Sequence, residues 1–157
     1  MKDIFLFASI TFGSGLLFTN IYTSMIDAKS WGADLPQSIE TARQYFKSTN
    51  PGKFFRLFAP INLILALVTL IFFWRVSTEV RIFLGVAFAL YVLVDVFTFA
   101  YFYPRNDVMF KTAPLTDVDA IQKAWKGWTS MNWLRSFIIF AGLVFSFLAL
   151  HEIYTAK

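Results

Sequence analysis

Hydrophobic residues fall into four long runs that polar connections separate. The runs cover residues 4–26, 57–74, 82–103 and 136–150, and residues 131–135 extend the last run backwards. Each run supplies roughly 20 residues of helix, the length that crosses a bilayer core of about 30 Å. The pattern predicts an all-α integral membrane protein, one domain over residues 1–157, with helices at about 4–26, 57–74, 82–103 and 117–152.

Four apolar helices of this kind are expected to form an up-down-up-down bundle. The longest connection, residues 28–56, holds one further pattern, because its residues 37–46 place apolar side chains on one side: Ile39, Ala42, Tyr45 and Phe46. This spacing predicts a short amphipathic helix lying on the membrane face. The first run is too long for a signal-peptide core, so we expect it to remain as a mature helix.

Composition agrees with a membrane protein and excludes several function classes. Charged residues make up 15% of the chain, against about a quarter in soluble domains, and the mean hydropathy is +0.58. The absence of cysteine excludes disulfide and thiol–quinone chemistry. One histidine and no Glu-x-x-His spacing exclude the usual haem, zinc and di-iron sites, so we expect no cofactor and no metal. The net charge of +4 suits an anionic lipid surface, and no pattern indicates nucleic-acid binding.

Glycines in the apolar runs indicate close helix packing. Gly13 and Gly15 lie in the first run, Gly85 in the third and Gly142 in the last. Small residues let helix backbones approach each other in lipid. These faces allow a second copy to pack in a homo-oligomer. The other expected partners are the lipid bilayer and a hydrophobic or aromatic small molecule.

The start of the last helix carries the most unusual polar pattern. Trp125, Trp128, Asn132 and Arg135 recur at steps of three and four residues and so share one helix face. Arg135 lies within a turn of the hydrocarbon, where a charge is costly unless it is paired or faces a wet cavity. The alternative is that Trp128 and Trp133 anchor the helix at the interface while the Arg135 side chain extends to the lipid headgroups.

Three further polar side chains lie inside or beside the hydrocarbon. Asp95 falls about two turns before the end of the third run, and a carboxylate at that depth marks either a functional site or a structural partner of Arg135 or Arg105. Asn20 and Asp27 share one face as the first helix nears its end, where interhelical hydrogen bonding and ligand binding are equally open.

An up-down bundle brings nearly all of these residues to one side of the membrane. The side chains expected there are Asn20, Asp27, Arg56, Asn62, Asp95, Tyr101, Tyr103, Arg105, Asn106, Trp125, Trp128, Asn132 and Arg135. We therefore predict a pocket that opens at this side, with Asp95 at its floor and aromatic walls. Ten of the fourteen Lys and Arg residues belong to the same side, which makes it cytoplasmic by the positive-inside rule. The expected location is the plasma membrane.

Short motifs spread over the chain match a known family. They are Gly13-Ser-Gly-Leu-Leu-Phe in the first helix, the Asn50-Pro51 turn before the second, Pro104-Arg105-Asn106 at the expected end or kink of the third, and Trp128-x-x-x-Asn132-x-x-Arg135 opening the fourth. The chain resembles the small four-helix membrane proteins that include anthrone oxygenases. That family usually has a proline and paired asparagines after the third helix, where this chain has Arg105, Asn106 and Asp107. The resemblance carries a site role to Asn106, Trp128, Asn132 and Arg135.

The resemblance implies cofactor-independent oxygenation of an activated phenolic carbon, in which a base generates a carbanion that itself reduces dioxygen. The residues permit this chemistry: Asp95 or Asp27 can act as the base, and Arg135 and Asn132 can stabilise the developing enolate. Aromatic side chains can stack on a planar substrate. The alternative is a non-catalytic membrane module in which the network of Asp95 and the arginines binds an amphipathic or anionic ligand, or fixes the bundle and its oligomer.

Overall fold

Four helical segments dominate the structure, a computed structural model that describes residues 2–112 and 114–155. The segments that are long and apolar enough to cross a membrane are Lys2–Trp31, Pro51–Phe73, Thr78–Thr112 and Val118–Thr155. No strand occurs in the described ranges. The predicted all-α class is confirmed, and so is the prediction of four helices that are long and apolar enough to cross a membrane.

Three of the long segments are not plain α-helices of membrane length. Wide π-helical turns (η) occur in two of them, and the remaining one is longer than a membrane requires. In chain order the elements are α1 (Lys2–Tyr22), η1 (Thr23–Asp27), α2 (Ala28–Trp31), α3 (Gln37–Tyr45), α4 (Pro51–Phe73), α5 (Thr78–Phe97), η2 (Thr98–Phe102), α6 (Tyr103–Asp107), η3 (Val108–Thr112) and α7 (Val118–Thr155). The π-helical turns belong to the first and third segments, and α7 is a single helix of 38 residues.

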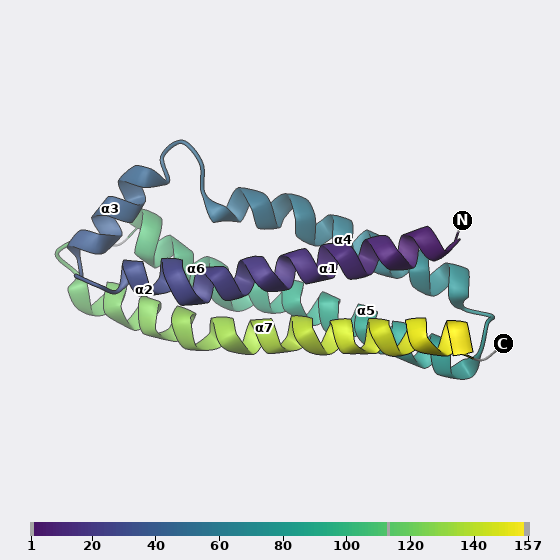
Figure 1. The fold of residues 1–157 in the computed structure, drawn as a ribbon. Helices are drawn as coiled ribbons and strands as arrows, with labels where there is room; N and C mark the ends of the chain where they lie inside the picture. The colour runs from purple at the N-terminus through teal and green to yellow at the C-terminus, as the bar shows by residue number, and fades with distance from the viewer. Residues whose placement is uncertain (1, 113, 156–157) are drawn as a thin grey trace.

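Figure 1 shows α1, α4, α5 and α7 lying side by side, with both ends of the chain at one end of the molecule. The shorter elements α2, α3 and α6 lie toward the other end. The contact between α5 and α7 is the most extensive, and α1 packs on both α4 and α7. The short helix α3 lies in the long connection after α2, and it buries Ile39 and Ala42.

Several helix boundaries differ from the sequence expectation, and two of them involve proline. The third segment does not end at Tyr103 but continues to Thr112. The π-helical turn η2 precedes Pro104, so the missing N–H of the proline falls in the first turn of α6. The second segment begins at Pro51 instead of residue 57, because proline is well suited to the first helical position.

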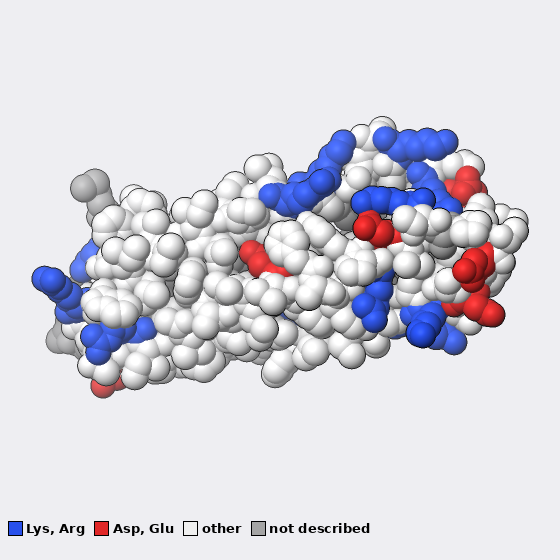
Figure 2. All heavy atoms as spheres, turned by 180° about the vertical axis from the view of Figure 1, so that it is seen from behind, with Lys and Arg blue, Asp and Glu red and all other residues white. Residues whose placement is uncertain are grey.

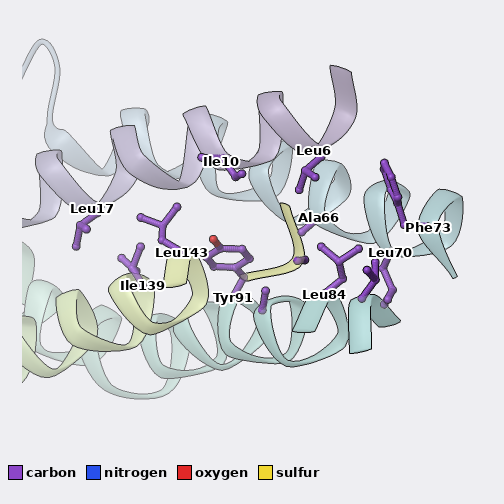
Figure 3. Close-up of a cluster of buried hydrophobic side chains, with 13 residues drawn as sticks. Leu6, Ile10, Leu17, Ala66, Leu70, Phe73, Leu84, Tyr91, Ile139 and Leu143 are labelled. Carbon is purple, nitrogen blue, oxygen red and sulfur yellow. The ribbon is translucent and has the colours of Figure 1, made fainter. Parts of the chain in front are cut away.

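Tyr91 crosses the middle of the bundle core, as Figure 3 shows. A Cβ atom on Gly142 would lie 2.7 Å from its ring atom Cε1, and a Cβ on Gly13 would lie 3.0 Å from its hydroxyl oxygen. Glycine at these two positions therefore leaves the space that the ring occupies. Gly15 and Gly85 differ, because an added Cβ would meet nothing within 4 Å. These two glycines do not serve helix packing within this chain.

A second buried cluster closes the end of the bundle where α2, α3 and α6 lie. We call its large rings the aromatic cap: Trp31, Phe46, Phe102, Phe110 and Trp128. Trp31 is central, since its ring makes edge-on contacts with three of the others at centroid distances of 5.1 to 6.1 Å. The cap joins the connection after α1 to the start of α7.

The outer surface suits hydrocarbon along the middle of the molecule. Figure 2 shows Lys and Arg gathered toward the two ends, whereas the middle of this face is almost uncharged. Each membrane helix exposes large apolar side chains, such as Phe18, Ile64, Val96 and Phe137. Such a belt is what contact with lipid tails requires, and the structure supports a membrane protein.

Candidate functional site

Asn20 of α1 and Asn132 of α7 form a reciprocal contact across the bundle. Both side chains are fully buried. Nδ2 of Asn20 donates to the carbonyl oxygen of Asn132 at 3.1 Å and to Ser136 Oγ at 2.7 Å. Nδ2 of Asn132 donates to the carbonyl oxygen of Asn20 at 3.2 Å and to Ser24 Oγ at 2.6 Å. We call these four residues the Asn–Ser clasp.

The serines fix the orientation of both amides. Ser24 Oγ donates to the carbonyl oxygen of Asn20, and Ser136 Oγ donates to that of Asn132, each at 3.1 Å. Because each hydroxyl hydrogen is used in this way, each serine oxygen is left to accept from the amide across the interface. Both asparagines must therefore turn their NH₂ groups toward the partner helix. The clasp holds α1 and α7 in register at this level.

The two amide oxygens have different surroundings. Oδ1 of Asn20 accepts a hydrogen bond from Nη2 of Arg135. Oδ1 of Asn132 is buried and has no hydrogen-bond partner in the described structure. A buried acceptor without a donor costs about 1–3 kcal/mol, so this oxygen is suited to a hydroxyl or N–H group supplied from outside the chain.

Arg135 is buried, with 6% of its surface exposed, so the alternative in which its side chain extends to the headgroups is wrong. Its second contact is long, at 3.5 Å from Nη1 to Thr98 Oγ1, and Nε has no partner in the described structure. Within the described ranges, the structure forms one ion pair, Lys111 with Asp107, so no carboxylate neutralises this guanidinium.

Aromatic rings surround the guanidinium in place of a carboxylate. The centre of the Phe102 ring lies 4.1 Å from Cζ of Arg135, that of Phe55 lies at 5.4 Å and that of Trp128 at 5.9 Å. Ring faces attract a cation by about 0.5–2 kcal/mol each. They stabilise the charge but leave N–H groups that can still donate.

Trp128 places a further unused donor at the same level. The residue is 4% exposed, and its indole Nε1 is buried without an acceptor among the described residues. Its ring stands edge-on to Trp31 at 5.1 Å and to Phe102 at 5.5 Å, so its orientation is fixed by the aromatic cap. Trp128, Asn132 and Arg135 thus carry two free donors and one free acceptor on one face of α7.

Asp95 of α5 is not hydrogen-bonded or ion-paired to this group. Its side chain is half-buried, and it makes no hydrogen bond or ion pair with a described residue, including Arg135 and Arg105. It shares a helix face with Thr98, three residues later, whose hydroxyl contacts Arg135. Asp95 is therefore about 4.5 Å of helical rise from that contact. Asp27 is also half-buried and without such a partner among the described residues.

The remaining predicted residues lie outside the network. Arg105 stacks on the ring of Tyr101, with Cζ 3.4 Å from the centroid, and donates to the Tyr101 carbonyl at 3.0 Å. Trp125 donates from Nε1 to the carbonyl oxygen of Ala28 at 2.7 Å and so ties α7 to α2. Tyr103 is exposed and contacts the ring of Phe99.

Asn106 is half-buried in α6. No hydrogen bond of its side chain is found in the described part of the chain. The predicted group is therefore divided: Asn20, Trp128, Asn132 and Arg135 lie together, whereas Tyr103, Arg105, Asn106 and Trp125 do not join them.

Neither of two hollows on the surface of the described chain is lined by Asp95, Asn132 or Arg135. One, of about 310 Å³, lies at the end of α4 beside Trp74. The other, of about 210 Å³, is a groove between α1 and α4 with a lining of Thr11, Phe12, Gly15, Leu16, Phe54 and Phe58. Because Asn132 and Arg135 are themselves buried, the network is closed in this conformation. No group of three or more His, Asp or Glu side chains in the described chain is placed to bind a metal ion.

Sequence reasoning missed the serines and the rings around Arg135. The signal for the serines is an Asn-x-x-x-Ser repeat, which occurs as Asn20 to Ser24 in the first helix and as Asn132 to Ser136 in the last. Two copies of one spacing on different helices indicate a reciprocal contact. Nothing in the pattern distinguishes Phe55 and Phe102 from the other phenylalanines, of which the chain has 20 in all.

Comparison with known proteins gives a family match. A family model described as anthrone oxygenase matches residues 52–145, which is more than half of the chain and includes Asp95, Asn106, Trp128, Asn132 and Arg135. No curated protein and no solved structure matches. The extent of the family match, on a four-helix apolar chain with a buried polar network, shows that this protein belongs to the anthrone oxygenase family.

Proposed function

We propose that the protein is an oxygenase-like membrane enzyme that binds a flat aromatic substrate at Arg135 and oxidises one activated carbon with dioxygen. The observation that carries this proposal is a buried guanidinium without a carboxylate partner in the described chain, inside the segment that matches the family. A charge that the chain leaves uncompensated suits a ligand oxygen that is anionic or becomes anionic during reaction.

The chemistry that the family resemblance implies begins with removal of a proton from a CH₂ carbon. The resulting carbanion shares its charge with an oxygen of the substrate as an enolate. Dioxygen takes electrons from this carbanion as a C–O bond forms, and a proton completes a hydroperoxide. Loss of water then leaves a carbonyl, so that CH₂ plus O₂ gives C=O plus H₂O. Dioxygen is the oxidant, and its second oxygen atom leaves as water.

Arg135 is the residue placed to stabilise the enolate oxygen. Its free Nε–H and the free indole N–H of Trp128 are the donors that the network leaves unused among the described residues. Asn132 has both amide hydrogens engaged in the Asn–Ser clasp, so it offers an acceptor, Oδ1, to a hydroxyl group of the substrate. In this role Asn20 is a positioning residue, because it holds the Arg135 guanidinium.

Asp95 is our assignment for the base. It is half-buried, it is free of an ion pair in the described chain, and it lies one helical turn from the Thr98 contact of Arg135. A carboxylate that is not locked to an arginine keeps its ability to accept a proton. Asp27 shares the first two properties but lies outside the segment that matches the family.

The test is oxidation of anthrone by the purified protein in lipid nanodiscs, followed as quinone formation. Removal of one preorganised donor to an oxyanion lowers kcat by about 10²–10³, and we expect a loss of this size for Arg135→Gln. Arg135→Lys keeps the charge and should retain more activity than Arg135→Gln. Arg81→Gln is the matched control, since Arg81 also stacks on an aromatic ring but does so on Trp74, at the connection between α4 and α5.

The variants separate the proposed roles. Asp95→Asn should abolish proton abstraction and leave the protein folded, whereas Asp27→Asn should keep most of the turnover. Full turnover by Asp95→Asn would remove Asp95 as the base. Equal activity of Arg135→Gln and wild type would overturn the role of the guanidinium, and the protein would then be the non-catalytic membrane module.

A further inference from the structure

The groove between α1 and α4 opens at the surface that faces lipid. Its lining is almost wholly apolar, and its six residues are Thr11, Phe12, Gly15, Leu16, Phe54 and Phe58. Gly15 is exposed, and an added Cβ there would meet nothing within 4 Å, so the missing side chain leaves the groove open. A hollow of about 210 Å³ on this surface is large enough for part of a ring system or an alkyl chain.

The groove leads toward the buried guanidinium. On α4, Phe54 packs against Phe58 at 4.6 Å and against Phe55 at 5.5 Å. Phe55 is the ring that lies 5.4 Å from Cζ of Arg135. Phe55 therefore links a residue that lines the groove to the guanidinium.

The α1 wall of the groove ends at the same level. Leu16 lines the groove, and Asn20 follows one helical turn later on the same face. Asn20 is the residue that accepts from Arg135. Each wall of the groove is thus followed along its helix by a residue that contacts Arg135, Asn20 on α1 and Phe55 on α4.

The charged residues around the groove indicate which kind of ligand enters it. Arg135 has no carboxylate partner in the described chain, and Lys53 and Arg56 flank the groove residue Phe54 at the start of α4, where both are exposed. Figure 2 shows basic side chains collected toward this end of the molecule. An amphiphile with an acidic oxygen is attracted by such residues at the headgroup level, and its apolar body fits the groove.

We propose that the α1–α4 groove is a lateral portal through which a flat aromatic amphiphile dissolved in the bilayer, with an oxygen that is anionic or becomes anionic during reaction, reaches Arg135, with Phe55 as the gate. The portal rests on the proposed function and deepens it, because the ligand it admits would be the substrate. Two parts of the proposal do not depend on catalysis: the ligand comes from the bilayer, and the guanidinium of Arg135 binds it.

The absence of native cysteine allows a clean test. Gly15→Cys places one thiol in the groove of the folded protein, and alkyl methanethiosulfonates of increasing size then fill the groove reversibly. Gly85→Cys is the matched control, because Gly85 is also a helical glycine with nothing within 4 Å of an added Cβ but lies on α5. The probe is anthracene-9-carboxylate, and its neutral comparison is 9-anthracenemethanol, both added to phosphatidylcholine nanodiscs.

We expect a butyl group on the thiol of the Gly15→Cys variant to lower the association rate of the carboxylate by about tenfold or more, as blocked access does. Reductant should restore the rate, and the same group on the Gly85→Cys variant should have no effect. Arg135→Gln should remove the preference for the carboxylate over the neutral alcohol. An unchanged rate after modification of the Gly15→Cys variant, or an unchanged preference in Arg135→Gln, would overturn the portal.

Turnover separates failure of the portal from failure of the proposed function. If the modified Gly15→Cys protein still oxidises anthrone at the full rate, the portal is wrong while the enzyme assignment stands. If the probe binds through the groove and no anthrone is oxidised, the portal stands and the proposed function fails.

Discussion

The Asn–Ser clasp predicts that its two asparagines differ in their contribution to stability. Asn132→Ala removes two donated hydrogen bonds. Asn20→Ala removes two donated hydrogen bonds and also the acceptor of Arg135. In the second variant the guanidinium keeps one long contact, to Thr98 at 3.5 Å. The charge on Arg135 therefore makes Asn20 the more important partner.

The magnitudes follow from the number and kind of bonds lost. Interhelical hydrogen bonds in a membrane contribute about 0.6 kcal/mol on average and at most about 1.7 kcal/mol, so Asn132→Ala should lower the free energy of unfolding by about 1–3 kcal/mol. A hydrogen bond to a charged group contributes about 1.5–3 kcal/mol. Asn20→Ala should therefore cost about 3–5 kcal/mol. The two substitutions should not be additive, because each amide binds the other helix at the same contact.

The assay is reversible unfolding in mixed micelles with increasing SDS, followed by helical circular dichroism and including the double variant. Thr69→Val is the matched control, because the buried Thr69 hydroxyl bonds within its own helix, to the carbonyl oxygen of Leu65 at 2.7 Å. That change should cost well below the Asn132→Ala value. A larger loss for Asn132→Ala than for Asn20→Ala, or full additivity, would refute the reciprocal contact.

Two more predictions concern the packing around Tyr91 and the hydrogen bond between α7 and α2. Gly142→Ala should lower the free energy of unfolding by about 1–3 kcal/mol through overpacking against Tyr91. The control Gly85→Ala should leave the free energy of unfolding unchanged or raise it by up to about 1 kcal/mol. Equal effects of the two substitutions in SDS unfolding would contradict the packing around Tyr91. Trp125→Phe removes the hydrogen bond to the Ala28 carbonyl and should lower the free energy of unfolding by about 1 kcal/mol. Amide exchange should become faster only in α2 and the aromatic cap. Unchanged exchange in these elements would show that this bond does not hold the cap.

The sequence was sufficient for the four apolar helices and for the shared face of Trp128, Asn132 and Arg135, because both depend on local spacing. Four apolar runs of membrane length predict four long apolar helices, and the structure has them. Steps of three and four residues place Trp128, Asn132 and Arg135 on one face whatever the rest of the chain does. The sequence also places Asn20 on the same side of the membrane as Asn132, but their mutual hydrogen bonds are seen only in the structure.

The partners of Arg135 could not be predicted, because they depend on how each helix is rotated about its own axis. Asp95 is a natural counterion by depth, but α5 and η2 present Thr98 to the guanidinium and leave Asp95 unpaired in the described chain. The π-helical turn η2 also sets the phase of Phe102, whose ring covers Arg135. Hydrophobic periodicity gives no sign of such a turn.

Dioxygen consumption by the purified protein in nanodiscs, with anthrone as substrate and ¹⁸O₂ as oxidant, tests whether the protein is an oxygenase. We expect one dioxygen to be consumed for each anthrone, one ¹⁸O in the new carbonyl, and a rate that falls by about 10²–10³ in Arg135→Gln. Dioxygen uptake that does not exceed the rate in empty nanodiscs, or an undiminished rate in Arg135→Gln, would contradict the proposed function.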